Sequence, residues 1–327
     1  MIPLIAPARD VHDRWYGRHT SLTKTQWVAT KEYDCLPYFE KLLLHAEALR
    51  RSTRAAVICG KAAAAIRGIP ILNLQHDTRV TLTLPGKPHT PSHNQWPIIA
   101  HYRRASLPDS DWEEVCGYRI TTPERTFTDI CAIDGELEGL AFIEAALRAG
   151  YRKDTFQKYL DDRRGEWGIT KARKVLALAR YGIDSPSETL AYYLAAQVYP
   201  RTSIEAQAQM SIKKPSGLYS RIRVDLLLFG WLVVEIDGRI KYGGADSARV
   251  LFEERARETA ILSMGYHILR FHPSELIDKL IPTIAVVLNQ NPHRHSPEKH
   301  TVPGSLFSCW ENMVRLVVGR TLFFVSH

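Results

Sequence analysis

The strongest constraint on the fold is a pair of apolar stretches, residues 221–228 and 232–237, joined by a short connection centred on Gly230. A three-residue loop with glycine in the left-handed conformation is a common β-hairpin connection. Such a loop pairs Leu228 with Leu232, and it fixes the register of both strands because side chains alternate between the two faces. We therefore predict an antiparallel hairpin with one apolar face, made of Val224, Leu226, Leu228, Leu232, Val234 and Ile236.

The opposite face of the predicted hairpin carries acids. Asp225 lies directly across from Glu235, and Asp237 follows on the same face. Two opposed carboxylates weaken a sheet unless positive charge lies between them. Mg2+ or Mn2+ is the expected source, because such ions take oxygen ligands and keep positions for water and phosphate. The alternative is a register shifted by one residue, which would leave solvated edge acids and expose the apolar side chains.

Two further side chains are candidates for the same site. Ser185 and Glu188 have the spacing of a capping box, in which a glutamate closes the first turn of a helix. The functional alternative is that this helix turns Glu188 toward the two opposed acids. Lys241 follows the acidic strand closely, and a lysine there would orient the attacking water or stabilise charge on the phosphate. A solvated lysine is the alternative.

Basic residues near the hairpin are candidates for binding a nucleic-acid backbone without sequence preference. They are Lys213, Lys214, Arg221, Arg223, Arg257 and Arg270. An i,i+4 pair with Glu253 is the alternative role of Arg257. The whole chain has 43 Lys and Arg against 35 Asp and Glu, a formal net charge of +8 that permits a polyanionic partner without requiring one.

The order of predicted elements indicates more than one domain in a mixed α/β fold. Short helices and a small sheet come first, and a series of helices then ends in glycines up to residues 182–184. Beyond that point the order helix, three strands, helix, strand, helix predicts a mixed sheet flanked by helices. The predicted parts are an α+β region (1–110), a helical connector (111–184), a domain built on this mixed sheet (185–290) and an irregular tail (291–327).

The cysteines and the apolar segments bear on the compartment. Five widely spaced cysteines without a C-x-x-C pair argue against a disulfide framework and a cysteine zinc site, so we expect a reducing cytoplasm. Residues 1–7 lack the basic start and the length of a secretory signal. Residues 306–325 contain Glu311, Arg315 and Arg320, which argues against a membrane-spanning helix.

At these residues the C-terminal part resembles the PD-(D/E)XK nuclease superfamily, specifically its Vsr-like (very-short-patch-repair-like) endonucleases. The motifs are Ser185-x-x-Glu188, Gln207, Arg223-Val-Asp225, Glu235-Ile-Asp237-Gly238-x-x-Lys241-Tyr242, Arg257-Glu258 and Gly265-Tyr-x-x-Leu-Arg270. The resemblance implies Mg2+-dependent phosphodiester cleavage, with Asp225 and Glu235 as metal ligands and Glu188 assisting. In one departure, Asp237 stands where the superfamily has its lysine. Lys241 takes over that role, the chemistry is altered, or the domain binds without cutting.

The upstream part is similar to the AbiEi-type antitoxin proteins of bacteria. The similarity lies in residues 60–70 (GKAAAAIRGIP), in the apolar alternation from Val80 to Leu84, and in residues 121–129 (TTPERTFTD). Such proteins usually begin with a DNA-binding winged helix, but residues 1–50 do not have helix-turn-helix spacing.

Together these patterns predict a metal-dependent DNA endonuclease or nicking enzyme, with phage defence or DNA repair as its setting. The alternative is a non-catalytic, antitoxin-like transcriptional regulator whose nuclease-like domain only binds DNA. RNA is not excluded as the substrate, because the metal chemistry is the same for both backbones. A homodimer stays open.

Overall fold

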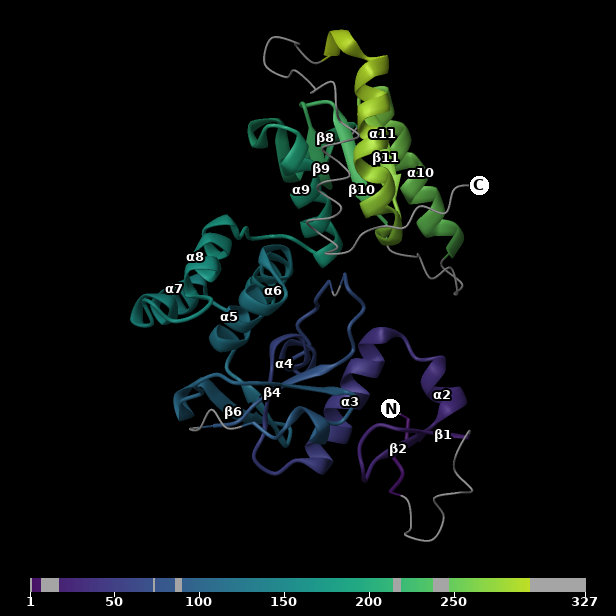
Figure 1. Ribbon diagram of the computed structural model, residues 1–327. Coiled ribbons are helices and arrows are strands. Elements are labelled where there is room, and N and C mark those ends of the chain that lie inside the picture. Colours follow the sequence, from purple (N-terminus) through teal and green to yellow (C-terminus); the bar gives the residue numbers. More distant parts are fainter. Residues whose placement is uncertain are drawn as a thin grey trace. The chain divides into compact units, whose positions relative to one another are not determined.

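The computed structural model describes residues 2–6, 18–72, 74–85, 90–213, 219–237 and 247–294. The fold is mixed α/β, as predicted, and the chain divides into two units, Met1–Tyr181 and Gly182–His327 (Figure 1). Each unit has its own sheet and its own helices, and each is described separately below. Among the described residues, no helix combines the length and apolar character needed to cross a membrane.

The first unit contains a small two-stranded sheet and a mixed five-stranded sheet of order β5-β4-β3-β7-β6. The strands are β1 (His19–Ser21), β2 (Trp27–Ala29), β3 (Val57–Cys59), β4 (Val80–Thr83), β5 (Ala100–Arg103), β6 (Trp112–Val115) and β7 (Tyr118–Thr121). The sequence predicted β4, β5 and β7. Because β6 and β7 belong to the same sheet as β3 to β5, the predicted domain boundary between residues 110 and 111 is wrong.

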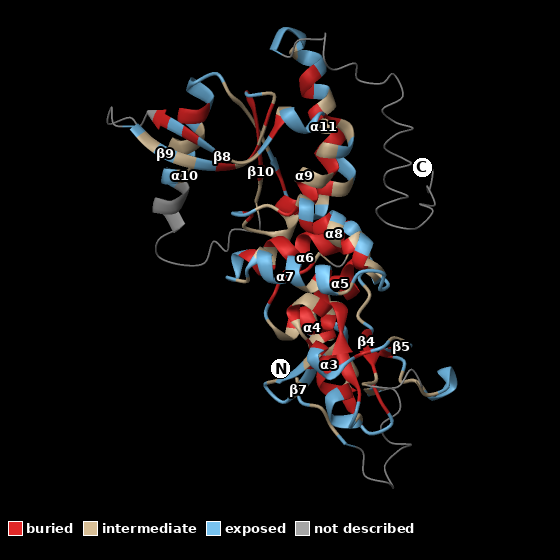
Figure 2. Ribbon diagram, turned by 90° about the vertical axis from the view of Figure 1, so that its left-hand side faces the viewer, coloured by how far each residue is buried: buried red, intermediate tan, exposed pale blue. Residues whose placement is uncertain are grey.

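The helices of the first unit are α2 (Thr30–Asp34), α3 (Tyr38–Ser52), α4 (Gly60–Ile66), α5 (Pro123–Ile133), α6 (Glu136–Arg148), α7 (Lys153–Asp162) and α8 (Ile169–Leu178). Thr122 caps α5 by accepting a hydrogen bond from the Arg125 N–H. Helices α5, α6 and α7 carry buried residues (Figure 2), which include Phe127, Phe142 and Phe156. The ring centroid of Phe127 lies 6.3 Å from that of Phe142 and 5.6 Å from that of Phe156. These aromatic contacts join the predicted helical connector into one core.

The second unit is a four-stranded sheet of order β11-β10-β9-β8 with helices packed on it. Its elements are α9 (Pro186–Val198), β8 (Ile204–Lys213), β9 (Tyr219–Leu228), β10 (Leu232–Ile236), α10 (Ser247–Ser263), β11 (His267–Phe271) and α11 (Leu276–Gln290). Strands β8, β9 and β10 are antiparallel, and α10 leads into β11, which is parallel to β10. This is the predicted order, although β8 extends further than the sequence indicated. Of the predicted tail, residues 295–327 lie outside the described residues.

Short 3₁₀ turns complete the connections. They are η1 (His93–Gln95), η2 (Asp109–Asp111), η3 (Arg201–Ser203), η4 (Pro273–Glu275) and η5 (Pro292–Arg294). The end of η2 matters most for stability, because Asp111 is fully buried there. Its carboxylate accepts hydrogen bonds from Arg125 at 3.0 Å and from Tyr159 at 3.1 Å, and it also binds Arg163. This carboxylate therefore joins η2 to α5 and α7.

Removing the Asp111 carboxylate should destabilise the first unit strongly. The change Asp111→Ala removes a buried partner from the guanidinium groups of Arg125 and Arg163, of which Arg125 keeps Asp129, and breaking such a buried ion pair costs about 3–5 kcal/mol. The exposed pair of Arg152 and Asp154 supplies the control, and Asp154→Ala should cost about 1 kcal/mol or less. Urea unfolding followed by tryptophan fluorescence suits this unit, because five of the seven tryptophans lie in residues 1–181. Equal losses in the two variants would contradict a structural role for Asp111.

Candidate active site

The hairpin of β9 and β10 has the predicted register. Leu228 pairs with Leu232, and Leu226 pairs with Val234. Gly230 has a φ of +75°, the left-handed conformation that the three-residue loop requires. The apolar residues predicted to share one face are buried on both strands, with Ile236 half-buried at the end.

Asp225 and Glu235 are the next residues on the two strands after the last pair of the ladder. They lie on neighbouring strands just beyond that pair, and they are close enough for the charge of Asp225 to raise the pKa of Glu235. The Asp225 Oδ2 atom accepts a hydrogen bond of 2.8 Å from the Ile236 N–H. This bond holds the Asp225 carboxylate against the backbone of β10, beside Glu235, and the predicted juxtaposition is present.

Glu188 closes the first turn of α9 and also contacts the sheet. Its carboxylate accepts hydrogen bonds from the Asp184 N–H at 3.1 Å and from the Ser185 hydroxyl at 2.9 Å, while its own N–H donates to Ser185. It also accepts a hydrogen bond from the side-chain amide of Gln207. Glu188 therefore caps α9, and the same carboxylate binds Gln207 on β8 and feels the charge of Asp225.

Gln207 links Glu188 to Asp225. It lies opposite Asp225, because Ala206 pairs with Leu226 and Ala208 pairs with Val224. The residue has a φ of +54°, which is rare for a side chain of this size, and its Oε1 atom is buried without a hydrogen-bond partner among the described residues. A positive φ outside glycine marks strain that the surrounding structure holds in place. The sequence singled out this glutamine only as part of a motif, and its contact with Glu188 shows how it joins the site.

The pKa values of the three acids are shifted in the same direction. Burial raises the pKa of Asp225, Glu235 and Glu188 above their ordinary values. Repulsion adds to this effect, because the charge of Asp225 raises the pKa of both glutamates. Asp237 raises the pKa of Asp225 and of Glu235 in the same way. The site thus holds negative charge that the protein alone solvates incompletely.

Arginines supply part of the positive charge that we expected from a metal ion. The Arg257 Nη2 atom lies 2.7 Å from Glu235 Oε1, and it also donates to the Arg223 carbonyl at 2.8 Å. Arg270 lies 3.3 Å from Glu235 Oε2 and 3.6 Å from Asp237. These arginines lower the pKa of Glu235, although burial outweighs them. We predicted that only a metal ion would make the closeness of Asp225 and Glu235 tolerable. For Glu235 this is corrected, because Arg257 and Arg270 already supply positive charge.

The other predicted nucleic-acid contacts are dispersed along the strands. Arg221 is exposed on β9, and Arg223 is paired with Asp184, a residue that the sequence did not single out. In the sequence, Asp184 is distinguished only by its position directly before the capping Ser185. Lys213 ends β8, while Lys214 and Lys241 lie outside the described residues. The role predicted for Lys241 stays a prediction.

The donor set fits a hard divalent ion held by few protein ligands. No group of three or more metal-ligating side chains is arranged to hold an ion in the described ranges. Mg2+ does not need such a cage, because it is usually bound through one or two carboxylates together with waters and substrate phosphates. Asp225 and Glu235 can provide that pair, and burial raises the pKa of both acids.

Comparisons with known proteins do not add to this description. No protein family, no curated protein and no solved structure matches the chain.

The raised pKa of Asp225 makes stability depend on pH. Its folded-state pKa lies above the ordinary 3.8, so ionisation costs folding free energy. That cost is absent below the ordinary pKa and complete above the raised one. Asparagine keeps an oxygen that can accept the Ile236 N–H and carries no charge. We therefore expect the stability of Asp225→Asn relative to the unchanged protein to rise as the pH increases from about 4 towards neutrality. Thermal unfolding midpoints across this range check the trend, and a difference that stays constant with pH would refute it.

Proposed function

We propose that the unit Gly182–His327 is a divalent-metal-dependent nuclease that hydrolyses phosphodiester bonds in DNA. The observation that carries this proposal is the placement of the half-buried Asp225 on β9 beside the buried Glu235 on the adjacent strand β10, where the Asp225 carboxylate accepts the Ile236 N–H, with Glu188 close enough to feel the charge of Asp225. Buried acids that raise one another's pKa are concentrated at functional sites. The order of helix and strands in this unit is also the one expected for a restriction-endonuclease-like domain.

Each residue of the site has a proposed role. Asp225 and Glu235 would hold Mg2+ or Mn2+, which when bound polarises the phosphate and activates water. Glu188 fixes the start of α9 and, through Gln207, the strand beside Asp225. Arg257 and Arg270 lie at 2.7 and 3.3 Å from Glu235 and are about one-third exposed. Both arginines can therefore leave the Glu235 carboxylate and bind a phosphate of the DNA strand instead.

Asp237 and Lys241 bear on whether the site cuts. Asp237 occupies the position where related nucleases have a lysine, and it is paired with Arg270 at 3.6 Å. We propose that Asp237 assists in the cation site and that Lys241 takes the lysine's role of orienting water. A cytoplasmic setting follows from the free thiols of Cys35, Cys59, Cys116 and Cys131. Phage defence or DNA repair would be the purpose, and a homodimer is compatible with it.

A non-catalytic DNA-binding regulator is the second candidate, and one observation favours it. Both carboxylate oxygens of Glu235 are engaged by arginines, as they would be in a site that no longer takes a metal. Under this proposal Arg221 and Arg223 would bind the DNA backbone, and the acids would serve only the fold. The two candidates differ in cleavage and in metal binding, which the next two predictions measure.

Replacing Asp225 should abolish cleavage and keep the fold. We expect Asp225→Ala to lower the rate of Mg2+-dependent cleavage about 100-fold or more, because a catalytic metal supplies several kcal/mol of transition-state stabilisation. Glu205→Ala is the matched control, since Glu205 is an exposed acid on neighbouring β8. Supercoiled plasmid, single-stranded DNA and RNA serve as substrates. If the unchanged protein leaves all three intact and still binds duplex DNA, the regulator is the better description.

Metal binding can be measured without any cleavage. Because a ligand that binds only the folded state stabilises it, millimolar Mg2+ should raise the thermal unfolding midpoint of the unchanged protein. The increase should be much smaller in Asp225→Asn, which lacks one of the two proposed ligands. NaCl at matched ionic strength controls for general screening of charge. An equal increase in both proteins would show that the ion binds elsewhere.

A further inference from the structure

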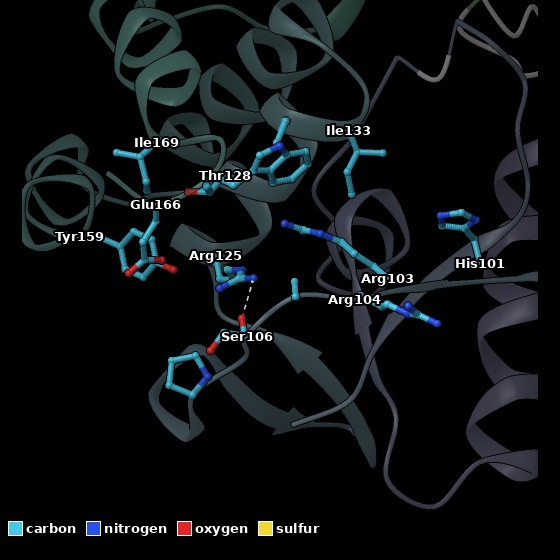
Figure 3. A pocket seen from close by; sticks show the side chains of 14 residues that line it. His101, Arg103, Arg104, Ser106, Arg125, Thr128, Ile133, Tyr159, Glu166 and Ile169 are labelled. Carbon is cyan, nitrogen blue, oxygen red and sulfur yellow. Dashed lines mark hydrogen bonds between the residues drawn. The ribbon is translucent and has the colours of Figure 1, made fainter. Parts of the chain in front are cut away.

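The first unit contains a cavity that the nuclease proposal does not use. It has a volume of about 900 Å³, near the upper end of the ~300–1,000 Å³ typical of small-molecule sites. Its walls come from the end of β5 and the segment after it, from α5, and from the region of α7 and α8 (Figure 3). All of its lining residues belong to Met1–Tyr181, so an inference about it is independent of the nuclease site.

One side of the cavity presents an aromatic surface. Trp167 lines it with 60% of its surface exposed, although a large indole is normally buried. Ile133 lies in the same wall and is 41% exposed. The guanidinium of Arg103 stacks over the indole ring at 4.3 Å from its centroid, and it is anchored by an ion pair with the buried Asp129. The indole therefore packs against an anchored guanidinium, and more than half of its surface stays accessible to a planar ligand.

The lining of the cavity is also cationic. Three arginines line it, against the single acid Glu166. Arg125 is fully engaged in the fold, through Asp111, Asp129 and the Ser106 carbonyl, the last of which is drawn in Figure 3. Arg104 is exposed, and its hydrogen bond to the Thr90 hydroxyl is long at 3.3 Å. Arg104 is thus the cation that can turn to an anionic ligand at little cost.

The amount of positive charge limits the size of the anion. His101 also lines the cavity, but burial and the neighbouring Arg79 lower its pKa, so it enters as a neutral hydrogen-bonding group near pH 7. Arg103 and Arg125 share the Asp129 carboxylate. Among the described lining residues, one available cation suits a single phosphate and not a triphosphate, whose charge would need further arginines, lysines or a metal ion.

We propose that this cavity binds a nucleotide carrying one phosphate, with the base stacked on Trp167 and the phosphate bound by Arg104. A flat ring beside a rigid indole and an anion beside an exposed guanidinium are the two recognition elements that nucleotides offer together. The same chemistry is presented by a free mononucleotide and by the 5′-phosphorylated end of a DNA strand. The test separates these two sources.

Calorimetric titration of the full chain with deoxyadenosine monophosphate tests the free nucleotide. Trp167→Ala should weaken binding about 5- to 100-fold, the range that base–aromatic stacking supplies, while Trp167→Phe should restore much of it. Arg104→Gln should weaken it about tenfold or more through loss of a charge-assisted contact. The matched controls are Tyr181→Ala, an aromatic residue 65% exposed, and Arg152→Gln, and both should leave the affinity unchanged.

A 5′-phosphorylated oligothymidine, with its unphosphorylated form beside it, tests the strand end. Binding of this oligonucleotide alone, weakened by the same two changes and by loss of the 5′-phosphate, supports the proposal with a strand end as the source. Binding of deoxyadenosine and inorganic phosphate with the same affinity as the nucleotide would overturn it. So would nucleotide and oligonucleotide affinities that neither Trp167→Ala nor Arg104→Gln alters. Loss of metal-dependent cleavage is not an outcome of this test, so failure here leaves the nuclease proposal unaffected.

Discussion

The candidate active site depends on the register of a single hairpin. Because Gly230 adopts the left-handed conformation, Leu228 meets Leu232, and every side chain that follows is assigned to one face or the other. A slip by one residue would bring the acids into the apolar layer. The hydrophobic effect on one face therefore sets the positions of the carboxylates on the other, although the acids themselves oppose their closeness.

Arginines from elements that come later in the chain offset part of the repulsion between the two carboxylates. Arg270 reaches Glu235 from β11, the neighbour of β10 on the side away from β9, whereas Arg257 on α10 binds Glu235 and also the Arg223 carbonyl of β9. Asp225 instead relies on a backbone N–H of β10. The two acids are thus compensated differently. Glu235 has side-chain partners that are about one-third exposed, whereas Asp225 is bound by a backbone N–H inside the sheet.

Local patterns in the sequence predicted the elements whose packing is periodic, and the remainder depended on contacts between distant residues. The apolar alternation around Gly230 and in Val80–Thr83 was enough to place β4, β9 and β10. Strand β3, with only three residues, is too short to show a period, and edge strand β6 (Trp112–Val115) has few apolar side chains. The arginine partners of Glu235 and the contact of Gln207 with Glu188 arise from tertiary packing, so no spacing in the chain announces them.

Glu188 combines two duties that are usually separate. It caps the first turn of α9, and it also accepts a hydrogen bond from Gln207 on β8, the strand next to the one that carries Asp225. Any replacement at this position would disturb the helix start and the neighbourhood of Asp225 together. If related chains retain this glutamate, its retention alone will therefore not distinguish selection for chemistry from selection for folding, and Asp225 is the more informative position to compare between lineages.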